Sequence, residues 1–137
     1  MPFFLFVEDP EIEKIKQKKL AEMLRQQQEA TSQADITDLN SSNFDQIIAK
    51  GLVLVDFWAE WCGPCRLMHP VFERMAKKYR HIRFARVNVD LNQEIAMRFG
   101  VQAIPTFIMF KDGQPVERMM GAVGEPGIHM IAKKYQM

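Results

Sequence analysis

The pattern of apolar and polar positions divides the chain into a helical N-terminal part and a longer part in which strands and helices alternate. Asp9-Pro10-Glu11 combines a capping acceptor, a proline suited to the first helical position and an acid in the first turn, which indicates a helix start. Apolar residues then recur at roughly helical spacing, at Ile12, Ile15, Leu20, Met23 and Leu24. We predict a helix over about residues 10–29 that frays in its Gln-rich end, followed by a linker over residues 30–34.

From residue 35 onward the pattern predicts short strands separated by helices. The expected strands are Ile36–Leu39, Leu52–Trp58, Ile82–Val89, Thr106–Phe110 and Val116–Met120. The expected helices carry Phe44 and Ile48, run from the cysteines to Tyr79, cover Asn92–Phe99, and begin at Glu125. Residues 52–58 show little alternation, which is typical of a central strand buried on both faces. Alternating elements that end in a hairpin, with its turn at Lys111–Gln114, predict an α/β fold with a mixed sheet and helices on both faces.

Length and charge limit the classes of function. A chain of 137 residues with 47% apolar residues is large enough for one domain with a core and an appendage. Its 18 basic and 17 acidic residues leave a net charge of +1, which does not favour nucleic-acid binding or electrostatic docking to a membrane. No window approaches the roughly 20 apolar residues that a membrane helix needs. We therefore expect neither a nucleic-acid nor a membrane partner.

The first residues, Met1–Val7, are apolar but form only a short run. No basic residue precedes them and acids follow at Glu8 and Asp9, so we expect no secretory signal. The default location is then cytoplasmic, where thiols stay mostly reduced. An apolar cluster such as Phe3–Val7 is a sticky surface when uncovered. We expect residues 1–34 to dock or to self-associate, with a solvated tail as the alternative.

The chain contains two cysteines, Cys62 and Cys65, at the junction between the apolar run and the helix that follows. This spacing at a strand-to-helix junction indicates a dithiol redox site. A thiolate attacks disulfides and a thiol hardly does, and Cys62 lies at the helix start, whose N–H groups stabilise an anion. We assign Cys62 as the attacking nucleophile and Cys65 as the resolving thiol. Gly63 permits close approach, Pro64 suits the first helical turn, and Trp61 offers an apolar surface beside the sulfur.

A zinc site is the alternative use of the two cysteines. Structural zinc needs about four ligands, and there is no second cysteine pair. His69, His81 and His129 are scattered, and we expect His69 to be exposed on the helix after the cysteines. No glycine-rich phosphate loop is visible either. We expect no metal and no bound cofactor, so that the Cys62–Cys65 disulfide itself carries the electrons.

These residues resemble a known family. The stretch Val55-Asp56-Phe57-Trp58-Ala59-Glu60-Trp61-Cys62-Gly63-Pro64-Cys65 closely resembles the active-site segment of thioredoxins, and the resemblance extends to Ile104-Pro105-Thr106 and Gly121-Ala122. It covers about residues 35–137. It implies the thioredoxin fold, with a central mixed sheet flanked by helices on both faces. Residues 1–34 are then an N-terminal extension outside the family's minimal domain.

The resemblance also implies roles for residues behind the cysteines. Asp56 matches the family's buried carboxylate, which helps to deprotonate the resolving thiol, Cys65, through water. On the residues alone, Asp56 could instead be a helix cap or a surface acid. Arg86 occupies a position where the family often carries a lysine near that acid, although its own pattern suggests a solvated face.

A second group of residues corresponds to the family's substrate groove. Pro105 matches a cis-proline that sits against the cysteines, and Ile104 offers backbone groups that pair with an extended substrate segment. Gly121 and Ala122 match part of the rim. Ala103 replaces a glycine common in the family just before the Ile-Pro pair, which narrows the groove.

The resemblance implies a protein-disulfide reductase of the thioredoxin type. Its partners would be disulfide-containing substrate proteins and a thioredoxin reductase that restores the dithiol. Two alternatives remain at this stage. The same fold can work as an oxidase or isomerase, although the Gly63-Pro64 dipeptide argues against this, and it can serve as a binding module in which the thiols are incidental.

Overall fold

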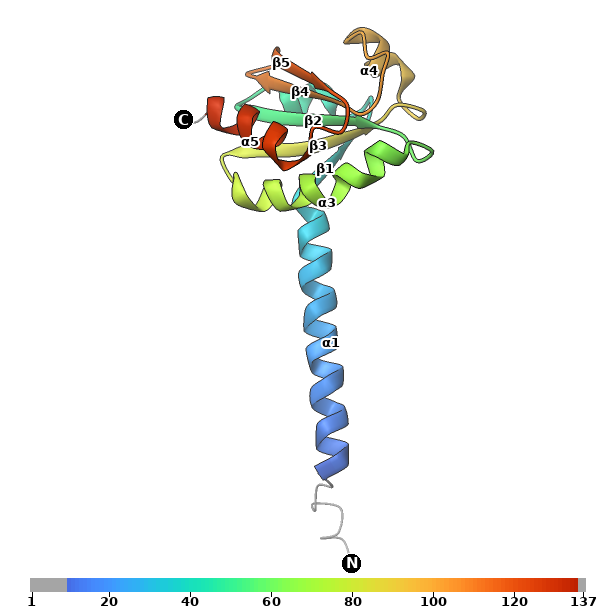
Figure 1. The fold of residues 1–137 in the computed structure, drawn as a ribbon, viewed down its shortest axis with the longest axis vertical. Helices are drawn as coiled ribbons and strands as arrows, with labels where there is room; N and C mark the ends of the chain where they lie inside the picture. Colours follow the sequence, from blue (N-terminus) through green and yellow to red (C-terminus); the bar gives the residue numbers. More distant parts are fainter. Residues whose placement is uncertain (1–9, 136–137) are drawn as a thin grey trace, which may run out of the picture. The chain divides into compact units, whose positions relative to one another are not determined.

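The computed structural model describes residues 10–135 and, within the first helix, the side chains of residues 12–24. The chain divides into two compact units, residues 1–33 and 34–137. In chain order the elements are α1 (Pro10–Ala34), β1 (Ile36–Leu39), α2 (Phe44–Ile48), β2 (Leu52–Trp58), α3 (Gly63–Lys78), β3 (Ile82–Asn88), α4 (Gln93–Arg98), β4 (Thr106–Lys111), β5 (Gln114–Met120) and α5 (Gly124–Lys134) (Figure 1). The strands and helices predicted after residue 35 are therefore present.

The second unit is built on a five-stranded sheet with the strand order β1-β3-β2-β4-β5. β3 pairs in parallel with both β1 and β2. β4 runs antiparallel to β2, and β5 runs antiparallel to β4. The expected mixed sheet is thus confirmed, and β2 lies at its centre, where neighbours on both sides satisfy its backbone groups.

Helices cover both faces of this sheet, and each face has its own apolar cluster. The cluster under α3 and α5 includes Leu52, Leu54, Met68, Phe72, Phe84, Phe107 and Ile128. The cluster under α2 and α4 includes Phe44, Ile48, Val53, Val55, Phe57, Ile95 and Phe110. Burial of β2 on both faces explains its nearly continuous apolar run.

The alternation along β2 decides where its one acid points. Leu52 and Leu54 face α3, whereas Val53 and Val55 face the opposite side. Since side chains two residues apart in a strand share a face, Asp56 and Trp58 lie on the α3 side. The central strand thus carries its carboxylate directly beneath the helix that begins at the cysteines.

The first helix is longer than its sequence pattern suggested. α1 runs without interruption from Pro10 to Ala34, so the linker predicted over residues 30–34 is wrong. Residues 26–34 contain no glycine or proline, and their glutamine, glutamate and alanine residues favour a helix. The apolar start over residues 3–7 lies outside the described part of the chain. Between residues 10 and 135 no helix is both long and apolar enough to span a membrane.

Candidate active site

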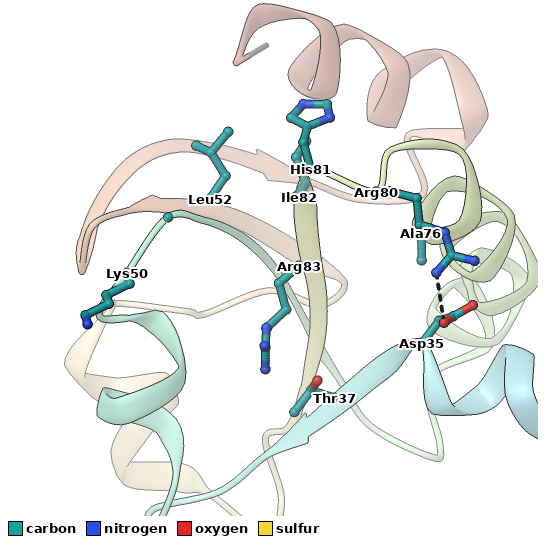
Figure 2. Close-up of a pocket in the computed structure, with 10 residues that line it drawn as sticks. Asp35, Thr37, Lys50, Leu52, Ala76, Arg80, His81, Ile82 and Arg83 are labelled. Atoms are coloured by element: carbon teal, nitrogen blue, oxygen red, sulfur yellow. Dashed lines mark hydrogen bonds and ion pairs between the residues drawn. The ribbon is translucent and has the colours of Figure 1, made fainter. Parts of the chain in front are cut away.

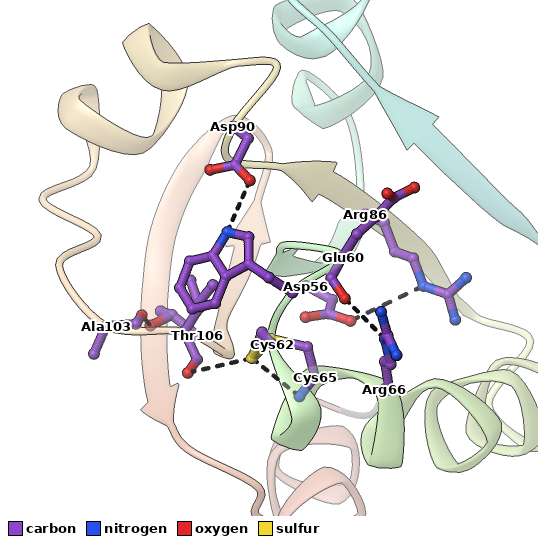
Figure 3. The surroundings of a disulfide bond; sticks show 11 residues. Asp56, Glu60, Cys62, Cys65, Arg66, Arg86, Asp90, Ala103 and Thr106 are labelled. Carbon is purple, nitrogen blue, oxygen red and sulfur yellow. Dashed lines mark hydrogen bonds and ion pairs between the residues drawn. A yellow bond between two sulfur atoms is a disulfide. The ribbon is translucent and has the colours of Figure 1, made fainter.

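Cys62 and Cys65 form a disulfide where β2 gives way to α3, with their Cα atoms 5.3 Å apart (Figure 3). Cys62 is the N-cap residue of α3 and has an extended backbone, and Pro64 lies in the first turn. Cys65 is completely buried, whereas Cys62 keeps 4% of its surface exposed. The two sulfurs are therefore unequal, and an incoming molecule reaches Cys62 first.

The surroundings of Cys62 favour negative charge on its sulfur. The backbone N–H of Cys65 donates a hydrogen bond to Cys62 Sγ over 3.2 Å. The positive end of the α3 dipole adds to this effect once the disulfide opens. The carbonyl oxygen of Ile104 lies 3.8 Å from the same sulfur, which places the loop before β4 directly beside the disulfide.

That loop carries Ile104 and Pro105, two of the residues that the resemblance assigns to a substrate groove. The Ile104–Pro105 peptide bond is cis, as the resemblance implied. Ile104 packs against the cluster formed by Ala59 and the two cysteines. The N–H of Gly121 donates to the carbonyl oxygen of Pro105 over 2.8 Å, which ties the end of β5 to the loop. Ala122 follows and is exposed.

Trp61, which the resemblance assigns to the substrate groove, directly precedes Cys62 and is exposed. Its side chain is 71% exposed, and its indole N–H donates to Asp90 Oδ2 over 2.9 Å. Gly63 and Pro64 are exposed beside it at the start of α3. The sequence offered no local signal for Asp90, because the aspartate follows β3 and meets Trp61 only through the parallel pairing of β2 with β3.

Asp56 lies behind the disulfide and is completely buried. It stands opposite Arg86 on β3 and Phe107 on β4. Arg86 Nε lies 3.9 Å from Asp56 Oδ2, and within residues 10–135 neither carboxylate oxygen has a hydrogen-bond partner. Burial raises the pKa of Asp56 to about 7, and the charge of Arg86 opposes part of that rise. The interpretation of Asp56 as a helix cap or surface acid is therefore wrong.

Arg86 belongs to the site, and the alternative of a solvated face is wrong. Its side chain is 14% exposed. One guanidinium nitrogen, Nη2, lies 3.4 Å from the backbone oxygen of His69 and 3.5 Å from Glu73 Oε1. The guanidinium carbon lies 5.9 Å from the centre of the Phe72 ring. These contacts hold a fixed positive charge close to Asp56 in the interior.

His69 differs from its expected exposure. It is partly buried, and its ring packs edge-on against Trp58 with 4.8 Å between the ring centres. Burial, and then the positive charge of Arg86, lower the pKa of His69, although Glu73 acts in the opposite direction. The spacing of four residues between Cys65 and His69 was visible in the sequence, but the direction of the ring was not.

A hollow of about 490 Å³ lies at the ends of the parallel strands that are remote from the cysteines (Figure 2). It is lined by residues that begin β1, β2 and β3, and an ion pair of 3.0 Å joins Arg80 to Asp35 at its edge. No thiol lines it. Over the described residues, no group of three or more potential ligands could hold a metal ion.

Comparison with known proteins identifies the family. The family model named thioredoxin matches residues 35–134, which include every site residue described above. The chain belongs to the thioredoxin family. A Cys-x-x-Cys motif alone does not identify a family. This match does, because it covers the whole of the mixed sheet and the helices that flank it.

Individual thioredoxins resemble the chain over at least four fifths of their own length. The thioredoxin of Chlamydia pneumoniae is 49% identical over 83 residues, which are 61% of this chain and 81% of that protein. The thioredoxin of Staphylococcus haemolyticus is 46% identical over 101 residues, which are 73% of this chain and 97% of that protein. A solved structure of Plasmodium falciparum thioredoxin superposes with a TM-score of 0.70 at 34% identity, covering 73% of this chain and 99% of that one. The fold is therefore the thioredoxin fold, and the chain is a thiol-disulfide oxidoreductase.

Proposed function

We propose that the thioredoxin domain reduces disulfide bonds in other proteins, with Cys62 as the attacking thiolate and Cys65 as the resolving thiol. The observation that carries this assignment is the difference between the two sulfurs. Cys62 alone retains exposed surface, and it accepts the N–H of Cys65 at the start of α3. A thiolate at this position is both reachable and stabilised.

The first step is attack on the substrate. The Cys62 thiolate bonds to one sulfur of a substrate disulfide, the substrate S–S bond breaks, and the other substrate sulfur leaves as a thiolate that takes up a proton. The carbonyl oxygen of Ile104 lies 3.8 Å from Cys62 Sγ, and Gly121 donates a hydrogen bond to Pro105 over 2.8 Å. These contacts support the proposal that an extended substrate segment binds along Ile104, Pro105 and Gly121. Trp61, Gly63, Pro64 and Ala122 form the exposed rim on either side.

The second step releases the reduced substrate. Cys65 loses its proton and attacks Cys62 Sγ, the mixed disulfide breaks, and the second substrate sulfur leaves as a thiolate. Two electrons have then moved from the protein dithiol to the substrate. Asp56 is the proposed acceptor of the Cys65 proton, because a carboxylate with a pKa of about 7 exchanges protons readily near neutral pH.

Cysteine variants test the two roles separately. Insulin reduction in the presence of dithiothreitol should be lost in Cys62→Ser, because no nucleophile can reach the substrate. Cys65→Ser should still attack but should accumulate a mixed disulfide that mass spectrometry detects. A Cys62→Ser variant as fast as the wild-type protein would overturn the assignment. A reduction potential measured against glutathione then distinguishes a reductase from an oxidase or isomerase.

The partners follow from the same chemistry. A dithiol that has been oxidised needs an external electron donor, so we propose a thioredoxin reductase as one partner and disulfide-containing proteins as the others. Work as a reductant fits a cytoplasmic location, where thiols stay reduced. The Cys62–Cys65 pair carries the electrons, and the proposed reaction uses no further cofactor.

Self-association through residues 1–34 stays a prediction. Five large apolar side chains of α1, namely Ile12, Ile15, Leu20, Met23 and Leu24, are each more than half exposed, and a single helix cannot bury them by itself. Light scattering of the full chain and of a chain lacking residues 1–34 would decide. The full chain should have the mass of an oligomer and the shortened chain that of a monomer, and a monomeric full chain would contradict the prediction.

A further inference from the structure

The proposed role of Asp56 raises the question of how its proton reaches solvent. The side chain is completely buried beneath α3. It receives a proton each time Cys65 is deprotonated, and it must lose that proton before the next cycle. A nearby titratable group that connects the interior with the surface would serve this exchange.

His69 occupies such a position. It lies four residues after Cys65 on α3, and side chains at this spacing share a helix face. Its ring packs against Trp58, which faces the same side of β2 as Asp56. Its backbone oxygen accepts a hydrogen bond from Arg86, whose Nε lies 3.9 Å from the carboxylate. His69 therefore contacts two of the residues that surround the acid.

One nitrogen of the His69 ring, Nε2, is buried and has no hydrogen-bond partner among residues 10–135, although the residue as a whole is only partly buried. Both oxygens of Asp56 share this property. Buried polar atoms without a protein partner are commonly satisfied by an ordered water. One water between the carboxylate and Nε2 would satisfy both groups at once.

We propose that His69 carries the proton from Asp56 to solvent, through one bridging water, while Cys65 is deprotonated and attacks the mixed disulfide, so that this transfer contributes to the rate of the resolving step. This inference rests on the proposed function, since it takes Asp56 as the acceptor of the Cys65 proton. The residue acts through Asp56 and touches neither the substrate nor the sulfurs.

The transfer is balanced in protons and moves no electrons. Asp56 gives its proton to the water, which passes one to Nε2, while Nδ1–H releases a proton to solvent. Asp56 ends ionised, the imidazole is neutral before and after, and only its tautomer has changed. Exchange with solvent restores the first tautomer before the next cycle.

The charges around the ring are compatible with this role. Arg86 on β3 and Arg66 on α3 disfavour a permanently charged imidazole, whereas Glu73 on α3 favours it. Burial adds to the effect of the two arginines, and the pKa of His69 is lowered as a result. The ring is therefore mostly neutral near pH 7, as a group that both accepts and donates a proton must be.

The test measures the resolving step directly. Reduced protein is mixed with excess insulin, the reaction is quenched with acid and alkylated, and mass spectrometry follows the mixed disulfide. In His69→Gln we expect the mixed disulfide to decay about tenfold more slowly at pH 7, with its formation unchanged. The loss is smaller than the ~10²–10⁴-fold contribution of a direct general base, because Asp56 is still present. In His69→Ala, added imidazole should restore the rate.

Two further variants separate the possible outcomes. His81→Gln replaces an exposed histidine, and its mixed disulfide with insulin should decay as fast as that of the wild-type protein. Asp56→Asn should slow the decay whether or not His69 takes part. If the mixed disulfide decays at the wild-type rate in His69→Gln but slowly in Asp56→Asn, the proposed proton transfer through His69 is wrong and the proposed function is unaffected. Slow decay in His69→Ala that imidazole does not restore would show a structural role and would also overturn the relay. If the mixed disulfide decays in Asp56→Asn as it does in the wild-type protein, the part of the proposed function that makes Asp56 the acceptor of the Cys65 proton is wrong.

Discussion

Replacing Asp56 by asparagine should stabilise the oxidised protein at neutral and alkaline pH. The carboxylate is completely buried and lacks a hydrogen-bond partner among the described residues, so its ionised form is costly. Asparagine has nearly the same shape and carries no charge. The variant therefore removes the cost of ionisation and leaves the packing beneath α3 nearly unchanged.

The size of the effect follows from the pKa of Asp56 in the two states. Burial raises this pKa from 3.8 to about 7 in the folded protein. Below pH 3.8 the carboxyl is protonated in both the folded and the unfolded state, so it does not change the unfolding free energy with pH. Between pH 3.8 and about 7 the folded state holds a proton that the unfolded state has lost, so wild-type stability falls as the pH rises. The shift of about 3 pKa units corresponds to about 4 kcal/mol, on the order of 1.4 kcal/mol per unit.

The assay is urea unfolding of the oxidised wild-type protein and the Asp56→Asn variant at pH 4, 5.5, 7 and 8.5. The difference in unfolding free energy, variant minus wild type, should increase by about 4 kcal/mol from the lowest pH to the highest and level off above pH 7. Asp38→Asn, which changes an exposed acid on β1, serves as the control. A difference that does not change with pH, or one that decreases, would refute the reasoning from burial.

Two other variants examine the surroundings of the same acid. Arg86→Met removes the positive charge 3.9 Å from Asp56, so the pKa of Asp56 should rise further above its ordinary value; carboxyl ¹³C NMR titration measures this, and an unchanged or lower pKa would contradict it. Phe72→Ala removes a fully buried ring that lies 4.9 Å from the Phe84 ring and 5.7 Å from the Phe107 ring, and should cost about 3–5 kcal/mol of unfolding free energy in urea at pH 7. Leu67→Ala on the exposed side of the same helix should change it by less than about 0.5 kcal/mol, and equal losses in the two variants would argue against this core.

Much of the fold could be predicted from local patterns. The apolar run over residues 52–58 forms the central strand, and the turn at Asp112-Gly113 joins β4 to β5, with positive φ at both residues. These features depend on neighbours in the sequence, where periodicity and turn chemistry are informative. The predicted end of α1, near residue 29, was wrong because helix ends depend on weak preferences of single residues.

Part of the candidate site was also predictable, because some of its features depend only on residues that are neighbours in the sequence. The cysteine spacing and its position before a helix are local, so the redox chemistry was visible in the chain itself, and the family match confirms it. The cis form of Ile104–Pro105 and the place of Asp56 came only from the resemblance to thioredoxins. Such bonds are a minority among X–Pro bonds, and nothing in the neighbouring residues marks one.

The sequence by itself determined the order of strands and helices, the redox pair, and the start of α3 at Cys62. The tertiary structure alone decided which side chains meet behind that pair. Arg86 reaches Asp56 because β3 pairs in register with β2, and His69 reaches Trp58 because α3 crosses the same face of the sheet. Burial and neighbouring charge set the pKa of a group, and both depend on residues that are distant in the chain and adjacent only in the folded protein.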